Sequence, residues 1–268
     1  MTGGGSRDAL WAVRGILGGR SYLVLAALGF ASFVGGWWLL AASGLVDAVF
    51  LPAPDAVARR WYAWFSDGSL LVDVRVSLGR VLGGFSLAVL MAVPLGLYIG
   101  TFRPLQAFFE PLMEFARYLP AVAFVPLVML WVGIGEAAKI ALIWIGTFFQ
   151  MVLMVSDNVR QVPMAQIEAA QTLGANRDEV ISRVVFKSAL PGIVDTLRIT
   201  LGWAWTYLVV AELVAANSGL GYAILRAQRF LQTDKIFVGI LLIGLLGLLF
   251  DQGFRLLHRR AFPWLHAR

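Results

Sequence analysis

Long runs of apolar residues without charge dominate this sequence. Between Arg80 and Arg103 there are 22 consecutive uncharged residues, and a second uncharged run extends over 21–46. A helix needs about 20 apolar residues to cross the hydrocarbon core of a bilayer. Because lipid offers no hydrogen bonds, a spanning backbone must satisfy its own polar groups, which a helix does. The sequence is therefore predicted to be an all-α, polytopic membrane protein.

Six apolar segments give the number of crossings. We predict about six spanning helices, at 22–42, 81–102, 118–135, 140–156, 194–216 and 236–254. Hydrophobic residues make up 59% of the chain and charged residues only 14%, which fits one membrane domain. The net charge of +6 is attributed to loops at lipid headgroups, and no nucleic-acid partner is expected.

The distribution of basic residues orients the spans. Placing both termini inside puts 14 of the 22 Lys and Arg residues on the inner side and 8 on the outer side. The positive-inside rule favours that arrangement. Residues 1–20 then form a cytoplasmic segment, 256–268 a basic cytoplasmic tail, and 50–80 an outer amphipathic segment. One helical face of that segment is predicted to carry Val57, Trp61, Trp64 and Phe65.

A polar stretch at 163–191 interrupts the apolar spans. Pro163 occupies a favoured first helical position, and Gly174 is a typical helix stop. Asn176 and Glu179 have the spacing of a capping box. These signals predict two short helices joined by a turn, on the inner side of the membrane.

The first of these helices contains a recognisable motif. Glu168, Ala169, Ala170 and Gly174 form E-A-A-x-x-x-G, which resembles the EAA loop of permease subunits in bacterial ABC importers. That family usually continues, nine residues after the glycine, with I-x-L-P. Here the corresponding proline is replaced by Lys187, and a proline appears four residues later.

Further segments resemble the nitrate, sulfonate and taurine branch of these permeases. They are L-P-x-P at 51–54, A-E-L-V-A-A at 211–216, S-G-L-G at 218–221 and P-W at 263–264. The resemblance implies a MetI-like, type I importer transmembrane domain over 21–255, with a periplasmic segment at 50–80 and a cytoplasmic coupling loop at 157–193. It also implies the coupling residues Glu168, Ala169, Ala170, Leu173 and Gly174.

The resemblance further implies a set of partners and a location. A dimer of ABC ATPase subunits would bind the coupling loop, a second permease copy would complete a homodimer, and a periplasmic binding protein would deliver the solute. The chain would lie in the bacterial inner membrane and form the pathway for a small solute, an anion such as nitrate, a sulfonate or taurine.

The number and positions of the Cys, His and Lys residues argue against catalysis or ATP binding by this chain. There are no cysteines, and both histidines, His258 and His266, lie in the tail. None of the three lysines follows a glycine, so the phosphate-binding G-x-x-x-x-G-K-[ST] sequence is missing. We expect no enzyme activity, cofactor or metal here, with ATP and Mg²⁺ bound by the partner ATPase.

Glu212 is the acidic residue within the predicted spans that most requires an explanation. A charge inside a span is costly and tends to face protein or water. The sequence leaves open whether Glu212 acts at an outer gate or pathway, or makes a structural hydrogen bond; as a lone acid it does not suit an anion site. An ion-coupled secondary transporter is an alternative, although only Arg198 and Asp251 join Glu212 as embedded charges. A non-catalytic structural subunit is the other alternative.

Overall fold

The computed structural model describes residues 18–265, which form helices without any strand. Most of the predicted 1–20 segment and the last three residues of the predicted tail, including His266, lie outside this range. Short 3₁₀ turns occur at Ala121–Phe124 and Pro263–Leu265, and a π-helical turn at Val180–Val185. The α-helices are α2 (Gly19–Ala42), α3 (Pro54–Ser66), α4 (Ser69–Thr101), α5 (Arg103–Arg117), α6 (Val125–Val132), α7 (Glu136–Arg160), α8 (Met164–Thr172), α9 (Arg177–Glu179), α10 (Phe186–Ala215), α11 (Leu220–Arg229) and α12 (Thr233–Ala261).

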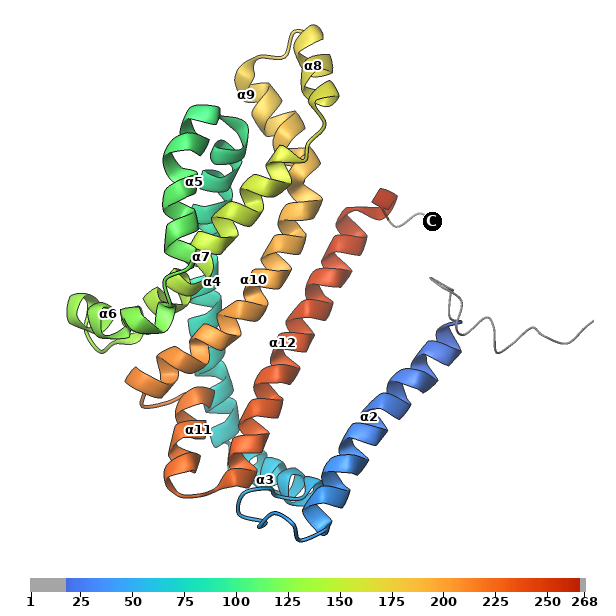
Figure 1. Ribbon diagram of the computed structural model, residues 1–268, viewed down its shortest axis with the longest axis vertical. Helices are drawn as coiled ribbons and strands as arrows, with labels where there is room; N and C mark the ends of the chain where they lie inside the picture. Colours follow the sequence, from blue (N-terminus) through green and yellow to red (C-terminus); the bar gives the residue numbers. More distant parts are fainter. Residues whose placement is uncertain (1–17, 266–268) are drawn as a thin grey trace, which may run out of the picture.

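Five helices of the described chain are long and apolar enough to cross a membrane. They are α2, α4, α7, the continuous helix Arg177–Val214 and α12. Figure 1 shows α3 and α11 at one end of this bundle and α8 at the other. We call these the α3 end and the α8 end. The predicted all-α, polytopic class is confirmed.

Glycines bring α4 and α7 into backbone contact. A Cβ atom on Gly84, Gly96 or Gly100 would lie within 3 Å of a carbonyl oxygen or side chain of α7. The α7 contacts advance along the chain in step with these glycines, from Ile143 to Val159, so the two helices run parallel. Close approach of this kind is typical of small residues in membrane helices. We call the line of contact along these glycines the seam. It forms the centre of the buried core.

Because of this seam, the effect of a Gly→Ala substitution in α4 on the free energy of unfolding should depend on the position of the glycine. Gly100→Ala is expected to destabilise the protein by about 1–3 kcal/mol, because the new Cβ meets the Ser156 carbonyl oxygen and Val159. Gly79→Ala is the matched control, since it lies in the same helix with open space around its Cβ position. Unfolding of the purified protein in detergent measures both. Equal effects of the two substitutions would contradict the packing argument.

The span predicted at 118–135, interrupted by Pro120 and Pro126, is broken in the structure at Pro120 and pairs with α5. The chain bends by 89° between Arg103–Arg117 and Ala121–Val132, and α6 contains only 8 residues. Proline causes the break, because Pro120 has no N–H to donate and disfavours a helical conformation for the residue before it. Since α4 and α7 run parallel, the chain must return between them, and α5 with this bend makes the return. Counting the bent pair as one broken span gives six crossings.

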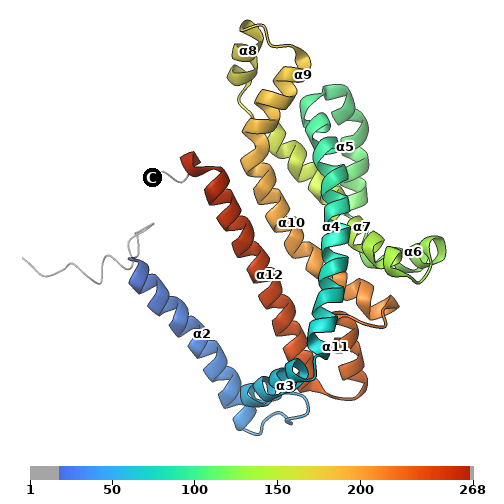
Figure 2. The ribbon, with the colours of Figure 1, turned by 180° about the vertical axis from the view of Figure 1, so that it is seen from behind.

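At the α3 end, α3 and α2 extend the bundle. Val57 and Trp64 of α3 are buried against α11 and α12, in a second core with Leu220 and Val238. Phe65 was predicted on the same face but is 51% exposed, because it directly follows Trp64 and so points to a different side of the helix. No residue of α2 is buried, and both views show it leaning away from the bundle (Figures 1 and 2).

Candidate functional site

Helix α8 lies at one end of the bundle, beside α9 (Figure 1). It follows Pro163, which is the N-cap rather than the first helical residue, a difference of one position. Gly174 ends the helix with a φ of +86°, a left-handed conformation that favours glycine. The Gly174 N–H donates to the Gln171 carbonyl at 2.9 Å and the Ala175 N–H to the Ala170 carbonyl at 3.0 Å. This pair of hydrogen bonds is a Schellman motif, so the predicted helix stop at Gly174 is observed.

The five predicted coupling residues lie on two faces of the α8 region. Glu168, Ala169 and Gly174 are exposed, and Leu173 is 88% exposed at the tip. Ala170 is instead half-buried and packs against the main core. The motif therefore divides into an outward surface and an inward anchor.

The second half of the polar stretch differs from the prediction of a separate short helix. The capping box is present, with the Glu179 N–H donating to Asn176 Oδ1 at 3.0 Å and the Asn176 N–H donating to Glu179 Oε2 at 3.1 Å. Beyond it the chain does not stop. It continues through the π-helical turn into α10, and Pro191 lies inside that helix. The resulting helix, Arg177–Val214, has 38 residues and reaches from the α8 region into the membrane bundle.

Specific contacts join the α8 region to the spans. The Arg160 guanidinium, at the end of α7, donates two hydrogen bonds of 2.9 Å to the Glu110 carboxylate of α5. The Arg177 guanidinium lies 4.2 Å from the centre of the Phe102 ring, at the turn between α4 and α5. Only three residues separate α7 from α8. The Ser188 hydroxyl of α10 also donates to Gln166 Oε1 of α8 at 2.7 Å. A displacement of α8 would therefore reach α7 and α10 directly, and α5 through Arg160 of α7.

Glu212 lies in a buried charge cluster toward the α3 end. Its carboxylate is fully buried and accepts hydrogen bonds from Arg80 Nη1 at 2.7 Å and Ser77 Oγ at 2.8 Å. Arg80 also donates two hydrogen bonds to Glu136, which pairs in turn with Lys139 at 2.8 Å. Glu212 is thus not a lone acid: α4, α7 and α10 each contribute to one network.

The same network holds the S-G-L-G turn before α11. The Gly221 N–H donates to Glu212 Oε2 at 2.7 Å, and Arg80 donates to the Ser218 carbonyl at 2.7 Å. Gly219 has a φ of +108°, and a Cβ atom there would collide with the Glu212 carboxylate. Glycine at this position thus satisfies both the backbone conformation and the close approach of Glu212.

The two other embedded charges from the sequence also pair. Arg198 Nε lies 2.8 Å from Asp251 Oδ1, joining α10 to α12 toward the α8 end. Within residues 18–265, no cluster of three or more His, Asp or Glu side chains has the geometry of a metal site.

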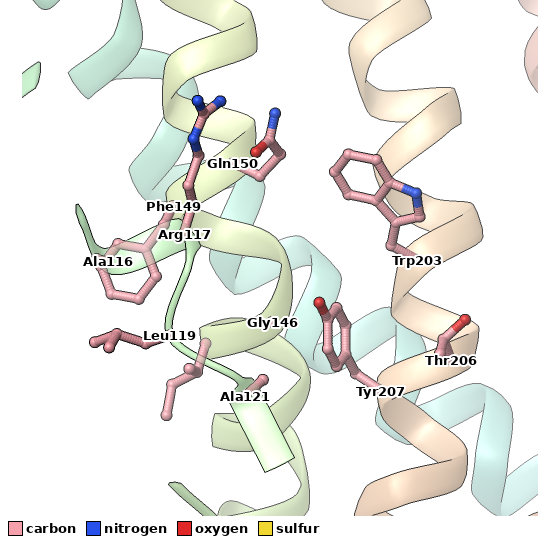
Figure 3. Close-up of a pocket in the computed structure, with 11 residues that line it drawn as sticks. Ala116, Arg117, Leu119, Ala121, Gly146, Phe149, Gln150, Trp203, Thr206 and Tyr207 are labelled. Atoms are coloured by element: carbon pink, nitrogen blue, oxygen red, sulfur yellow. The ribbon is translucent and has the colours of Figure 1, made fainter. Parts of the chain in front are cut away.

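A cavity of about 300 Å³ lies halfway between the two ends of the bundle. Its walls come from the α5–α6 bend, the middle of α7 and the middle of α10 (Figure 3). Figure 3 shows Arg117 and Gln150 on one side of the opening and Trp203 and Tyr207 on the other. The lining residues are Ala116, Arg117, Leu119, Ala121, Ile145, Gly146, Phe149, Gln150, Trp203, Thr206 and Tyr207.

No local sequence pattern indicates this cavity or the buried cluster. The count of basic residues assigns Arg117 to the inner side, because the span at 118–135 is predicted to begin after it. With the bend in place, Arg117 lies beside Phe149 and Gln150, in the middle of α7. Arg80 was counted as an outer charge, and its pairing with Glu212 joins residues 132 positions apart.

Long spans, a proline-broken crossing and a cavity at half depth define a membrane transport subunit. The chain belongs to the family of binding-protein-dependent transport system inner membrane components, whose model matches residues 92–263. It is accordingly a multi-pass permease of the ABC importer class found in the inner membrane.

Individual relatives agree with this assignment. The taurine transport system permease protein TauC of Escherichia coli strain K12 is 37% identical, over 85% of this chain and 85% of TauC. The bicarbonate transport system permease protein CmpB of Synechocystis strain PCC 6803 is 28% identical, over 91% of this chain and 90% of CmpB. An inward-facing structure of the MetNI methionine ABC transporter shares the fold, with a TM-score of 0.61 and 20% identity, over 71% of this chain and 96% of that one. The predicted MetI-like importer fold is confirmed.

Proposed function

We propose that this permease carries a small anion across the inner membrane, energised by a separate ATPase subunit. The class of solute is inferred from relatives whose names specify taurine and bicarbonate transport. The observation that carries the proposal is α8: a short helix capped at Gly174 at one end of the bundle, linked to α7 by three residues and to α10 by the Ser188 hydroxyl, which donates to Gln166 Oε1 at 2.7 Å. ATP and Mg²⁺ bind to the ATPase, and this chain holds no cofactor of its own.

Helix α8 inserts into a cleft of the ATPase subunit. Ala169 allows close approach because it has little side-chain bulk, Leu173 supplies an apolar contact at the tip, and Glu168 accepts charge-assisted hydrogen bonds. Ala170 serves as the anchor that holds α8 against the core. Closure of two ATPase subunits moves α8 and, through α5, α7 and α10, switches the pathway from inward-facing to outward-facing.

The full importer contains two copies of this permease, two ATPase subunits and a periplasmic binding protein. In this arrangement the α8 end and both chain termini are cytoplasmic, and the α3 end is periplasmic. Glu212 then keeps the periplasmic S-G-L-G turn in place, a structural role that its three hydrogen bonds from Ser77, Arg80 and Gly221 support better than gating.

Leu173→Asp tests the docking of α8. We expect copurification with the ATPase to fall by about tenfold or more, because an apolar contact is lost and a charge is introduced into it. Leu45→Asp is the matched control, since Leu45 is 81% exposed in the loop after α2. The measurement is the ATPase retained by the tagged permease, at equal permease yield. Equal retention in the two variants would refute the docking assignment.

The sequence contains no cysteine, so a single introduced cysteine can report on which side of the membrane α8 lies. A single cysteine at Leu173 should be protected from a membrane-impermeant maleimide in intact spheroplasts and react after permeabilisation. A single cysteine at Leu45 should react in both conditions. The reverse pattern would place α8 outside the cytoplasm and exclude an ATPase contact.

A further inference from the structure

Arg117 differs from the other charged groups at the level of the spans. Arg80, Glu136, Lys139 and Glu212 neutralise one another, and Arg198 pairs with Asp251. Arg117, by contrast, donates to the neighbouring Tyr118 hydroxyl at 3.1 Å and lies 4.9 Å from that ring. No acidic side chain of the described residues forms an ion pair with it. Its positive charge is therefore available to a ligand.

Arg117 lies near the middle of the spanning helices, where an unpaired positive charge requires an explanation. It shares the cavity with Gly146 and Gln150, near the midpoint of α7, and with Trp203 and Tyr207 in the middle of α10. A charge at this level is costly unless it faces protein or a water-filled space. Arg117 faces the cavity (Figure 3), which places a cation where a solute would cross.

Other cavity groups complement the guanidinium. Gln150 supplies amide N–H donors and Tyr207 supplies a hydroxyl group, both of which can bond to an oxyanion. Tyr207 reaches α7 because residue 146 is glycine: a Cβ atom there would overlap the Tyr207 ring. Apolar walls from Ile145, Phe149 and Trp203 enclose the remaining volume, and about 300 Å³ suits a small molecule.

We propose that Arg117 is the centre of an anion-binding site in the permease itself. The site takes one small oxyanion group, a sulfonate or a carboxylate-like group such as bicarbonate, on the planar fork of the guanidinium. This inference rests on the proposed function and extends it, because it assigns charge selection to the permease as well as to the binding protein.

The position of Arg117 also relates this site to the ATPase stroke. It is the last residue of α5, whose Glu110 is bonded to Arg160 next to α8. Movement of α8 would shift α5, and with it Arg117, relative to Gln150 on α7. The site can thereby hold the anion in one state of the transporter and release it in the other.

Uptake by the intact transporter tests the proposal. The complex is purified with its native ATPase through a tag on this chain, placed in liposomes with its binding protein, and supplied with radiolabelled taurine, bicarbonate or choline. We compare the wild type with Arg117→Gln, Arg117→Lys and the control Arg59→Gln, which changes an exposed arginine of α3. Anion uptake and ATP hydrolysis are measured over a range of solute concentrations.

We expect Arg117→Gln to lower anion uptake by about tenfold or more, because a hydrogen bond between the guanidinium and the charged solute is lost. Association with the ATPase should stay intact. Arg117→Lys should retain an intermediate rate, and Arg59→Gln should match the wild type. If the wild type takes up taurine or bicarbonate and Arg117→Gln takes it up at the same rate, the anion site is overturned. The proposed function is not affected by that result. Uptake of choline but of neither bicarbonate nor taurine, a zwitterion that carries a sulfonate group, also overturns the anion site. A wild type without ATP-driven uptake of any probe refutes the proposed function.

Discussion

Replacing Gly174 by proline is expected to reduce ATP-driven uptake to background while the protein still inserts into the membrane. Gly174 has a φ of +86°, which proline cannot adopt, and its N–H donates to the Gln171 carbonyl. Both features of the helix end would be lost, so α8 would no longer present Leu173 and Glu168 in a fixed orientation. A loose connection would absorb the movement of the ATPase instead of transmitting it.

Uptake and ATP hydrolysis by the reconstituted complex check this expectation. Gly44→Pro is the matched control, since Gly44 also has a positive φ, of +71°, with open space around it, in the loop after α2. Glu168→Arg should give the same uncoupling by reversing a charge on the outward face of α8. Normal uptake by both Gly174→Pro and Glu168→Arg would remove the coupling assignment.

The second large effect is expected at the buried cluster. Glu212→Leu should lower the free energy of unfolding by about 3–5 kcal/mol, because it leaves Arg80 buried with part of its charge uncompensated. The S-G-L-G turn would also lose the acceptor of the Gly221 N–H. Denaturant unfolding of the purified permease in mixed micelles measures the change.

Two comparisons make this result specific. The double variant Arg80→Met/Glu212→Leu should recover part of the loss, because it no longer buries an uncompensated guanidinium. Asp55→Ala breaks an ion pair in which the Asp55 side chain is 55% and the Arg59 side chain 74% exposed, and should change stability by less than about 1 kcal/mol. An effect of Glu212→Leu as small as that of Asp55→Ala would show that the cluster does not stabilise the fold.

Local signals explain what the sequence predicted correctly. The spans at 22–42 and 236–254 are uninterrupted apolar runs, and the capping box of Asn176 and Glu179 depends on residues three positions apart. The stop at Gly174 likewise follows from the conformational freedom of one residue. Each of these features is determined within a few turns of helix.

The errors arose where tertiary packing outweighed local preference. At 118–135 the prolines predict an interrupted span, but the 89° angle at Pro120 and the pairing with α5 follow from the return between two parallel helices. At 177–191, Lys187 and Pro191 leave the end of the second short helix open, and the helix continues because it packs against α7 on its way into the bundle. Pairing of Arg80 with Glu212, and the cavity around Arg117, depend on helices distant in sequence, which no local pattern encodes.

The glycine seam between α4 and α7 has a mechanical consequence. At present the hydrogen atoms of the α4 glycines face carbonyl oxygens of α7. If one helix slid along the other, larger side chains of α4 would face those carbonyl oxygens instead. These two helices must therefore travel as a single rigid body during transport. A change of shape within the subunit would then have to occur outside this pair, and the 89° bend next to Arg117 adjoins the cavity.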